Sequence, residues 1–176
     1  MIESLITSKT RINLLLKFFL NSQTKSYLRG LELEFGESSN SVRVELNRLE
    51  RAGLLISAIE GNKKMFFANT AHPLYYDINN ILKKHIGIDL ITSHIFDKIP
   101  NLNLVYLTGD FANGKNSKTI EFILEGNNLD ELLIEKLVME VEKNLTRSIR
   151  FSINHSGENI NPKGRNKLFK IWQTKI

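Results

Sequence analysis

Arginine and asparagine residues recur between positions 39 and 52 at a spacing that can place them on one surface. If this stretch is a helix, with about 100° between successive residues, Val42, Leu46 and Leu49 share one face. Arg43 and Asn47 then lie on the opposite face. Arginine can bond guanine through two donors, asparagine can do the same with adenine, and a small apolar side chain can contact a thymine methyl group. The polar face therefore has the chemistry needed to read base edges in a DNA major groove.

Position along this helix divides the candidates into two groups. The N-terminal part of a recognition helix lies closest to the bases, so the base-contact candidates are Ser39, Asn40, Arg43, Val44 and Asn47. Cations later in the helix, or just after a turn at Gly61 and Asn62, can reach phosphates or a minor groove, and these are Arg48, Arg51, Lys63 and Lys64. We expect Glu45 and Glu50, on the flanks, to pair with neighbouring arginines. A polar helix face is more often simply solvated, so its place in the fold must decide between the two interpretations.

The elements around this polar helix supply that place. Apolar residues at i, i+3, i+4 and i+7 predict a helix over 9–20, and Ser26 can cap a second helix that ends at Gly36. Two strand-like runs within 54–69, joined by the glycine-containing turn, predict a hairpin. Helix, helix, short turn, helix and hairpin is the order of a winged helix-turn-helix. The first helix is apolar on two sides, so we expect a dimer contact or the second half of the chain to cover it.

Residues 10–70, and in particular the stretch FGESSNSVRVELNRLERAGLL at 35–55, resemble bacterial winged-helix transcriptional regulators of the ArsR-like kind. In this resemblance the polar helix is the recognition helix and the hairpin is the wing. Gly30 and Glu32 stand where the family more often places a helix former and a small residue. Such regulators commonly work as homodimers on palindromic operators, so the resemblance implies double-stranded DNA and a second copy of the chain as partners. The expected dimer seam is the first helix or the helix after the wing.

After residue 72 the pattern predicts two linking helices, at 74–86 and 90–99, and then a small α/β unit. Beyond Pro100 the predicted order is a strand at 102–107, a loop or turn at 109–114, a strand at 119–125, a helix at 129–145, a strand at 148–153 and a short terminal helix at 167–172. We therefore expect an α+β chain in three parts: a winged helix-turn-helix domain at 1–72, linker helices at 73–99 and a small α/β domain at 100–176.

Segments 104–114 and 119–124 are similar to the core of the nucleotidyltransferase superfamily, in which one strand ends in Gly-Ser and the next carries Asp-x-Asp. The resemblance implies a nucleotidyltransferase-like fold whose paired carboxylates hold divalent ions. In this chain Asp110 stands in place of the serine, Thr119 in place of the first carboxylate, and Glu121 in place of the second. We expect no catalytic, cofactor or metal site, and a domain retained for dimerisation, for sensing a small-molecule effector or for a partner protein. A metal pair of Asp110 and Glu121 from different strands is the alternative.

The amino-acid composition excludes several classes of protein and of site. Hydrophobic residues make up 41% and charged residues 24% of the 176, as in ordinary globular proteins. The chain has no cysteine, hence no disulfide and no thiolate metal site, and its four histidines are scattered. The apolar run at 12–20 contains Asn13 and Lys17 and is shorter than the about 20 residues of a membrane span. We expect a cytoplasmic protein with no membrane contact and no bound metal.

The charge distribution points to a polyanionic partner. Residues 1–71 carry ten Lys and Arg against seven Asp and Glu, residues 72–146 carry seven against eleven, and residues 147–176 carry seven against one. Both ends are basic, which favours polyanions through long-range attraction. We predict a sequence-specific DNA-binding transcriptional regulator without catalytic activity. The alternatives are a metal-dependent nucleotidyltransferase whose N-terminal domain binds a nucleic-acid substrate, and a module that binds only another protein.

Overall fold

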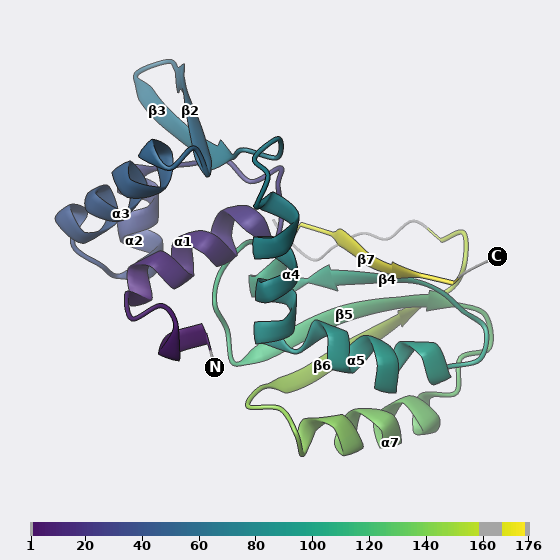
Figure 1. The fold of residues 1–176 in the computed structure, drawn as a ribbon. Coiled ribbons are helices and arrows are strands. Elements are labelled where there is room, and N and C mark those ends of the chain that lie inside the picture. Colours follow the sequence, from purple (N-terminus) through teal and green to yellow (C-terminus); the bar gives the residue numbers. More distant parts are fainter. Residues whose placement is uncertain (1, 159–166, 175–176) are drawn as a thin grey trace. The chain divides into compact units, whose positions relative to one another are not determined.

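The computed structural model of the chain describes residues 2–158 and 167–174, and its architecture is α+β (Figure 1). The chain folds as two compact units, Met1–His85 and Ile86–Ile176, each built around a sheet of its own. The division between them falls inside the segment that the sequence predicts to link two domains.

The first unit combines helices with a small antiparallel sheet. Its elements are η1 (Ile2–Ser4), α1 (Lys9–Phe19), β1 (Ser26–Tyr27), α2 (Leu28–Phe35), α3 (Ser39–Arg51), β2 (Leu55–Glu60), β3 (Lys63–Ala68) and α4 (Tyr75–Ile86), the last of which reaches the boundary between the units. The sheet has the order β1-β3-β2, with both pairings antiparallel. The turn at Gly61 and Asn62 joins β2 to β3, as the sequence predicts.

The predicted role of Ser26 as a helix cap is wrong. Ser26 lies in β1, where it is the register partner of Phe66 in β3. Tyr27 is the residue before α2 and its side chain makes no capping hydrogen bond. The long-range strand pairing therefore uses the backbone that the local pattern assigned to a helix start.

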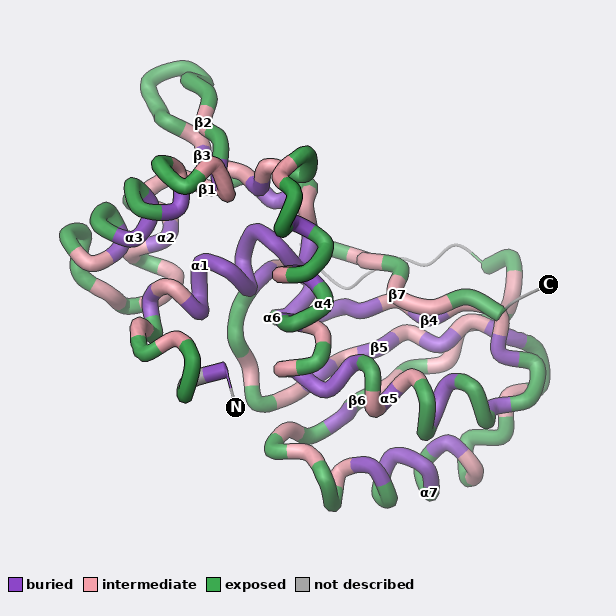
Figure 2. The backbone as a smooth tube through the Cα atoms, in the orientation of Figure 1, coloured by how far each residue is buried: buried purple, intermediate pink, exposed green. Residues whose placement is uncertain are grey.

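Helix α1 is buried on all sides, which accounts for its two apolar faces (Figure 2). It packs with α3 and β3, and at its C-terminal end the Phe19 ring stacks on Tyr75 of α4 with 5.6 Å between centroids. The Asn79 side chain of α4 is buried and its Nδ2 donates to the Phe19 carbonyl at 2.5 Å. This bond satisfies a carbonyl in the last turn of α1, where no further helical N–H is available.

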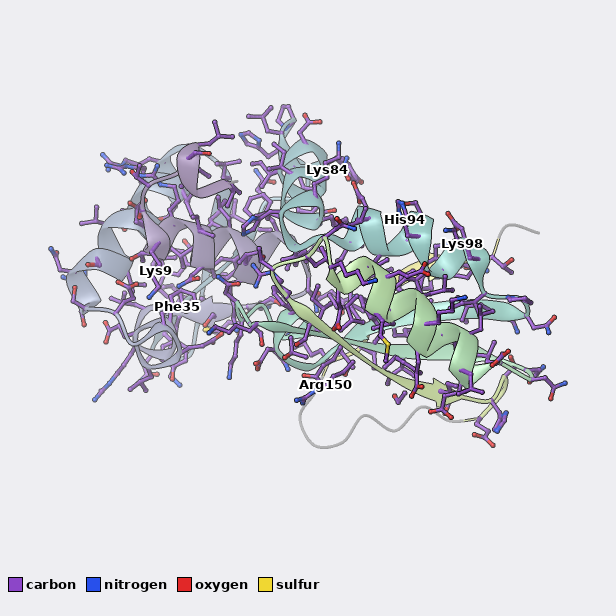
Figure 3. The ribbon with its side chains drawn as sticks, turned by 90° about the horizontal axis from the view of Figure 1, so that it is seen from below. Lys9, Phe35, Lys84, His94, Lys98 and Arg150 are labelled. Atoms are coloured by element: carbon purple, nitrogen blue, oxygen red, sulfur yellow. The ribbon has the colours of Figure 1, made fainter. Side chains whose placement is uncertain are left out.

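The second unit is a four-stranded mixed sheet with helices. Its elements are α5 (Ile88–His94), η2 (Phe96–Lys98), β4 (Leu102–Thr108), α6 (Gly109–Ala112), β5 (Thr119–Gly126), α7 (Glu131–Glu142), β6 (Ser148–Asn154) and β7 (Phe169–Gln173). The strand order is β6-β5-β4-β7, in which β5 and β6 are parallel and the other two pairings are antiparallel. Helix α7 supplies the crossover between the parallel strands, and Figure 3 shows it lying across the sheet.

Three sequence predictions in this unit need correction. The stretch predicted as a terminal helix is strand β7, because its backbone pairs with the edge of β4 and the indole N–H of Trp172 donates to Asp97 at 2.9 Å. The predicted loop at 109–114 contains the short helix α6. The predicted helix at 90–99 is interrupted at Ile95, so that α5 is followed by the separate 3-10 turn η2.

We expect the substitution Asn79→Ala to lower the free energy of unfolding by about 1–3 kcal/mol, because it leaves the buried Phe19 carbonyl without a donor. Asn80→Ala is the matched control, since Asn80 is the exposed neighbour in the same helix and the gain in helix propensity is the same. Urea titration followed by circular dichroism measures both. Equal stabilities of the two variants would contradict a role for the Asn79 bond.

Candidate nucleic-acid interface

Helix α3 is oriented by its apolar side. Val42, Leu46 and Leu49 are buried, and the helix packs against α1 and α2. The helix begins after Ser38, whose Oγ accepts from the Ser41 N–H at 3.2 Å, which is the usual bond of a serine N-cap. This packing leaves the opposite side of α3 to solvent.

Every residue that the sequence predicts for DNA contact is exposed in the structure. On α3 these are Ser39, Asn40, Arg43, Val44, Asn47, Arg48 and Arg51, and at the start of β3 they are Lys63 and Lys64. Val44 is 44% exposed although it is apolar, so its side chain is accessible from solvent. The apolar and polar faces of residues 39–52 are therefore arranged as the helical spacing predicts.

The structure brings four of these nine residues around one groove. The groove lies between the start of α2, α3 and the hairpin, has a volume of about 480 Å³, and is called the α3–hairpin groove below. Its lining combines cations, amides and apolar side chains: Tyr27, Leu28, Arg29, Arg43, Leu46, Asn47, Asn62, Lys63, Lys64 and Phe66. Ser39, Asn40, Val44, Arg48 and Arg51 lie outside it.

Sequence reasoning missed three polar members of the groove, Tyr27, Arg29 and Asn62. Tyr27 and Arg29 reach it because β1 pairs with β3, with Tyr27 opposite Met65. This pairing carries the start of α2 to the hairpin. A two-residue strand has no periodicity of its own, so no local pattern indicates the arrangement.

Two acidic residues of α3 bind cations from other elements. Glu45 is buried and accepts from Arg11 of α1 at 2.8 and 3.1 Å and from Arg48 at 3.3 Å. Glu50 accepts from Lys64 of β3 at 2.8 Å and from Ser57 of β2 at 2.5 Å. The predicted pairing with neighbouring arginines is therefore correct for Glu45 and wrong for Glu50, because the hairpin brings Lys64 and Ser57 to that carboxylate.

The other polar side chains of this surface differ in whether they are already bonded within the protein. Within residues 2–158 and 167–174, the side chains of Arg43 and Asn47 have no hydrogen bond or ion pair, whereas the Arg51 Nε donates to the Asn47 carbonyl at 3.3 Å. The Lys63 Nζ lies 4.4 Å from the centroid of the Tyr27 ring. Arg43, Asn47 and Lys63 can thus exchange solvent for a ligand without losing a protein ion pair.

The pKa values of both carboxylates reflect these contacts. Burial acts to raise the pKa of Glu45, but hydrogen bonds from Arg11 and Ser8 and the charges of Arg11 and Arg48 outweigh it and lower the pKa below its usual value. Hydrogen bonds from Lys64 and Ser57 lower the pKa of Glu50. Both side chains are therefore ionised at neutral pH and bind their cations as charged partners.

A second candidate region lies where β4 meets α6 in the second unit. Gly109 has φ +66°, and a Cβ at this position would lie 2.4 Å from the Glu121 Oε1, so the glycine and the carboxylate are in close contact. Asp110 is exposed, and the Thr119 Oγ1 is hydrogen-bonded to Ser148 at 3.1 Å. Among the described residues, no three or more His, Asp or Glu side chains are grouped so as to hold a metal ion.

No family model, curated protein or solved structure matches the chain. In the part of the chain that the structure describes, no helix is both long enough and apolar enough to cross a membrane. Of the basic residues after position 146, Arg150 is exposed on β6 (Figure 3), and Lys163, Arg165 and Lys175 lie outside the described residues.

We expect Glu45→Gln to lower the free energy of unfolding at pH 7 by about 1–3 kcal/mol, because hydrogen bonds to a charged group are lost. The stabilisation by Glu45 is complete above the pKa of the unfolded state, about 4.3, and is lost as the pH falls through the lower pKa of the folded state. The difference between wild type and variant should therefore shrink between pH 7 and pH 3.

Urea titrations at several pH values measure this difference. Glu32→Gln is the control, since Glu32 has no ion pair among the described residues, and it should lower the free energy of unfolding at pH 7 by less than Glu45→Gln does. A difference for Glu45→Gln that stays constant down to pH 3 would show that its charge does not stabilise the fold.

Proposed function

We propose that the chain is a cytoplasmic, DNA-binding transcriptional regulator whose first unit is a winged helix-turn-helix. The order of α1, α2, α3 and the β2–β3 hairpin supports this assignment, as does the resemblance of residues 10–70 to ArsR-like regulators. The observation that carries the proposal is the division of α3 into a buried apolar side and an exposed side on which Arg43 and Asn47 have no partner among the described residues.

In this proposal α3 enters the major groove and the hairpin lies on the adjacent backbone. Arg43, Asn47 and Val44 contact base edges, with Ser39 and Asn40 at the start of the helix. Lys63 is a stronger phosphate contact than Lys64, because Lys64 is already paired with Glu50 at 2.8 Å and would have to share its charge. Arg48 shares its charge with Glu45 in the same way.

A homodimer is part of the proposal. The resemblance implies one, and apolar side chains just before and within α4 are exposed: Leu74 by 52%, Tyr76 by 72% and Ile81 by 49%. Such side chains near a helix surface are suited to contact a second copy. Helix α1 is less suited, because its apolar residues are buried within the chain.

We propose that the second unit has a nucleotidyltransferase-like fold without transferase chemistry and serves a regulatory or interaction role. Its strand order and the contact between Gly109 and Glu121 support the fold, and Thr119 at the first carboxylate position supports the loss of chemistry. The rival proposal is a metal-dependent nucleotidyltransferase, for which Asp110 and Glu121 are the available acids.

We expect the wild-type protein to shift a duplex that contains its binding site in a salt-dependent way. Random duplexes bound by the purified protein would identify that site. Arg43→Ala should weaken binding by about 5–150-fold, the factor for about 1–3 kcal/mol at one base contact, and Asn47→Ala should also relax the sequence preference. Lys136→Ala is the control, because Lys136 is an exposed cation on α7 and its loss changes the net charge equally.

Three results would contradict this function. Equal weakening by Arg43→Ala and Lys136→Ala would mean that only overall charge matters. Transfer of label from a nucleoside triphosphate in the presence of magnesium or manganese, abolished by Glu121→Gln, would favour the enzyme instead. A protein that shows neither DNA binding nor transfer would favour a module that binds another protein.

A further inference from the structure

The α3–hairpin groove has a lining that a duplex backbone does not require. Apolar side chains of Leu28, Leu46 and Phe66 contribute to it, together with the Tyr27 ring. Its volume of about 480 Å³ lies within the about 300–1,000 Å³ typical of small-molecule sites. A sugar-phosphate strand needs charge and hydrogen-bond donors, whereas an apolar and aromatic lining favours a planar ring.

The charged part of the lining is entirely positive. Arg29, Arg43, Lys63 and Lys64 contribute to it, and no Asp or Glu lines the groove among the residues that the structure describes. Lys64 is paired with Glu50, which lies outside the lining, and the other three cations have no carboxylate partner within the described part of the chain. The groove therefore favours a ligand that carries both an aromatic ring and an anionic group.

The aromatic part of the lining is held in place before any ligand binds. The Lys63 Nζ lies 4.4 Å from the Tyr27 ring centroid, and the Lys64 Nζ lies 5.0 Å from that of Phe66. Gly30 lies within α2, and a Cβ there would be 3.2 Å from the Tyr27 Cε1. A glycine inside a helix is unfavourable by about 1 kcal/mol relative to alanine, and here its missing side chain gives the Tyr27 ring room against the helix.

We infer that the α3–hairpin groove binds a nucleoside monophosphate unit. The base lies on the apolar lining beside Tyr27, the amides of Asn47 and Asn62 are available to its polar edge, and the phosphate lies among Arg29, Arg43 and Lys63. The unit can be a free mononucleotide or an unpaired nucleotide at the end of a strand. This binding does not depend on the proposed DNA-binding function.

A regulatory consequence follows, and it rests on the proposed function. Arg43, Asn47, Lys63 and Lys64 belong both to the groove and to the proposed DNA contacts. A mononucleotide in the groove would occupy groups that the duplex needs, and the two ligands would compete. Free nucleotide would then lower the affinity for DNA.

The binding test uses the full chain and calorimetric titration with AMP, with adenosine and inorganic phosphate as separate probes. We expect AMP to bind at least about tenfold more tightly than either part alone, because only AMP combines the ring with the anion. Arg29→Ala should weaken AMP binding by about fivefold or more. Lys9→Ala is the control, since Lys9 is an exposed cation of the same unit that lies outside both the groove and the proposed DNA contacts.

Tyr27→Leu and Gly30→Ala test the aromatic contact. The first removes the ring, and the second crowds it, so both should weaken AMP binding while circular dichroism shows a folded protein. The inference is overturned if inorganic phosphate binds as tightly as AMP, if AMP does not bind, or if Lys9→Ala and Arg29→Ala have equal effects.

Further binding experiments distinguish a free nucleotide from a strand end, and nucleotide binding from the proposed DNA-binding function. A duplex with a one-nucleotide overhang that binds more tightly than the blunt duplex, with the gain lost in Tyr27→Leu, identifies a strand end as a source. AMP that displaces a bound blunt duplex identifies the free nucleotide as a competitor, and unchanged duplex affinity overturns the regulatory consequence. If AMP binds in an Arg29-dependent way but no duplex binds, the proposed function is refuted and the inference about the groove stands. If duplex binds but AMP does not, the inference about the groove is refuted and the proposed function stands.

Discussion

The apolar side of α3 and the ion pair between Arg11 and Glu45 together determine which face of the helix is exposed. Glu45 lies at the border between the apolar and polar sides of the helix, and its carboxylate is buried against α1. A buried carboxylate without a cation is strongly unfavourable, so the helix is held in the rotation that keeps Arg11 and Glu45 together. In that rotation Val42 and Leu46 enter the core, and Arg43 and Asn47 face solvent.

A second carboxylate relates the hairpin to the same helix. Glu50 binds Ser57 of β2 and Lys64 of β3, so both strands are tied to the last turns of α3. The α3–hairpin groove lies between elements joined in this way, which limits how far its two walls can separate. The two acidic residues of α3 are thus engaged at its flanks, whereas Arg29, Arg43 and Lys63 of the groove have no carboxylate partner among the described residues.

The second unit uses its carboxylate differently. In β5, residues two apart share a face, so a second acid beside Glu121 would have to stand at Thr119 or Ile123. Thr119 is bonded to Ser148 of β6, and Ile123 is apolar. Glu121 instead lies against Gly109, where only a residue without a side chain leaves room for the carboxylate. Glu121 therefore has no neighbouring acid on its face of β5.

How much of the fold can be predicted from the sequence depends on whether the contacts join neighbouring or distant residues of the chain. The apolar spacing of Val42, Leu46 and Leu49 is local, and it predicts both the helix and its exposed face. Strand β7 forms by pairing with β4, and Ser26 lies in a strand because β1 pairs with β3. Both partners are distant in the sequence, so no local pattern predicts these pairings. The groove combines both cases: its α3 wall is predictable, whereas Tyr27 and Arg29 enter through two residues of β1. A groove built on a short, long-range pairing becomes visible only when the strands are placed, so sequence reasoning found its α3 wall, Arg43 and Asn47, and missed its aromatic side.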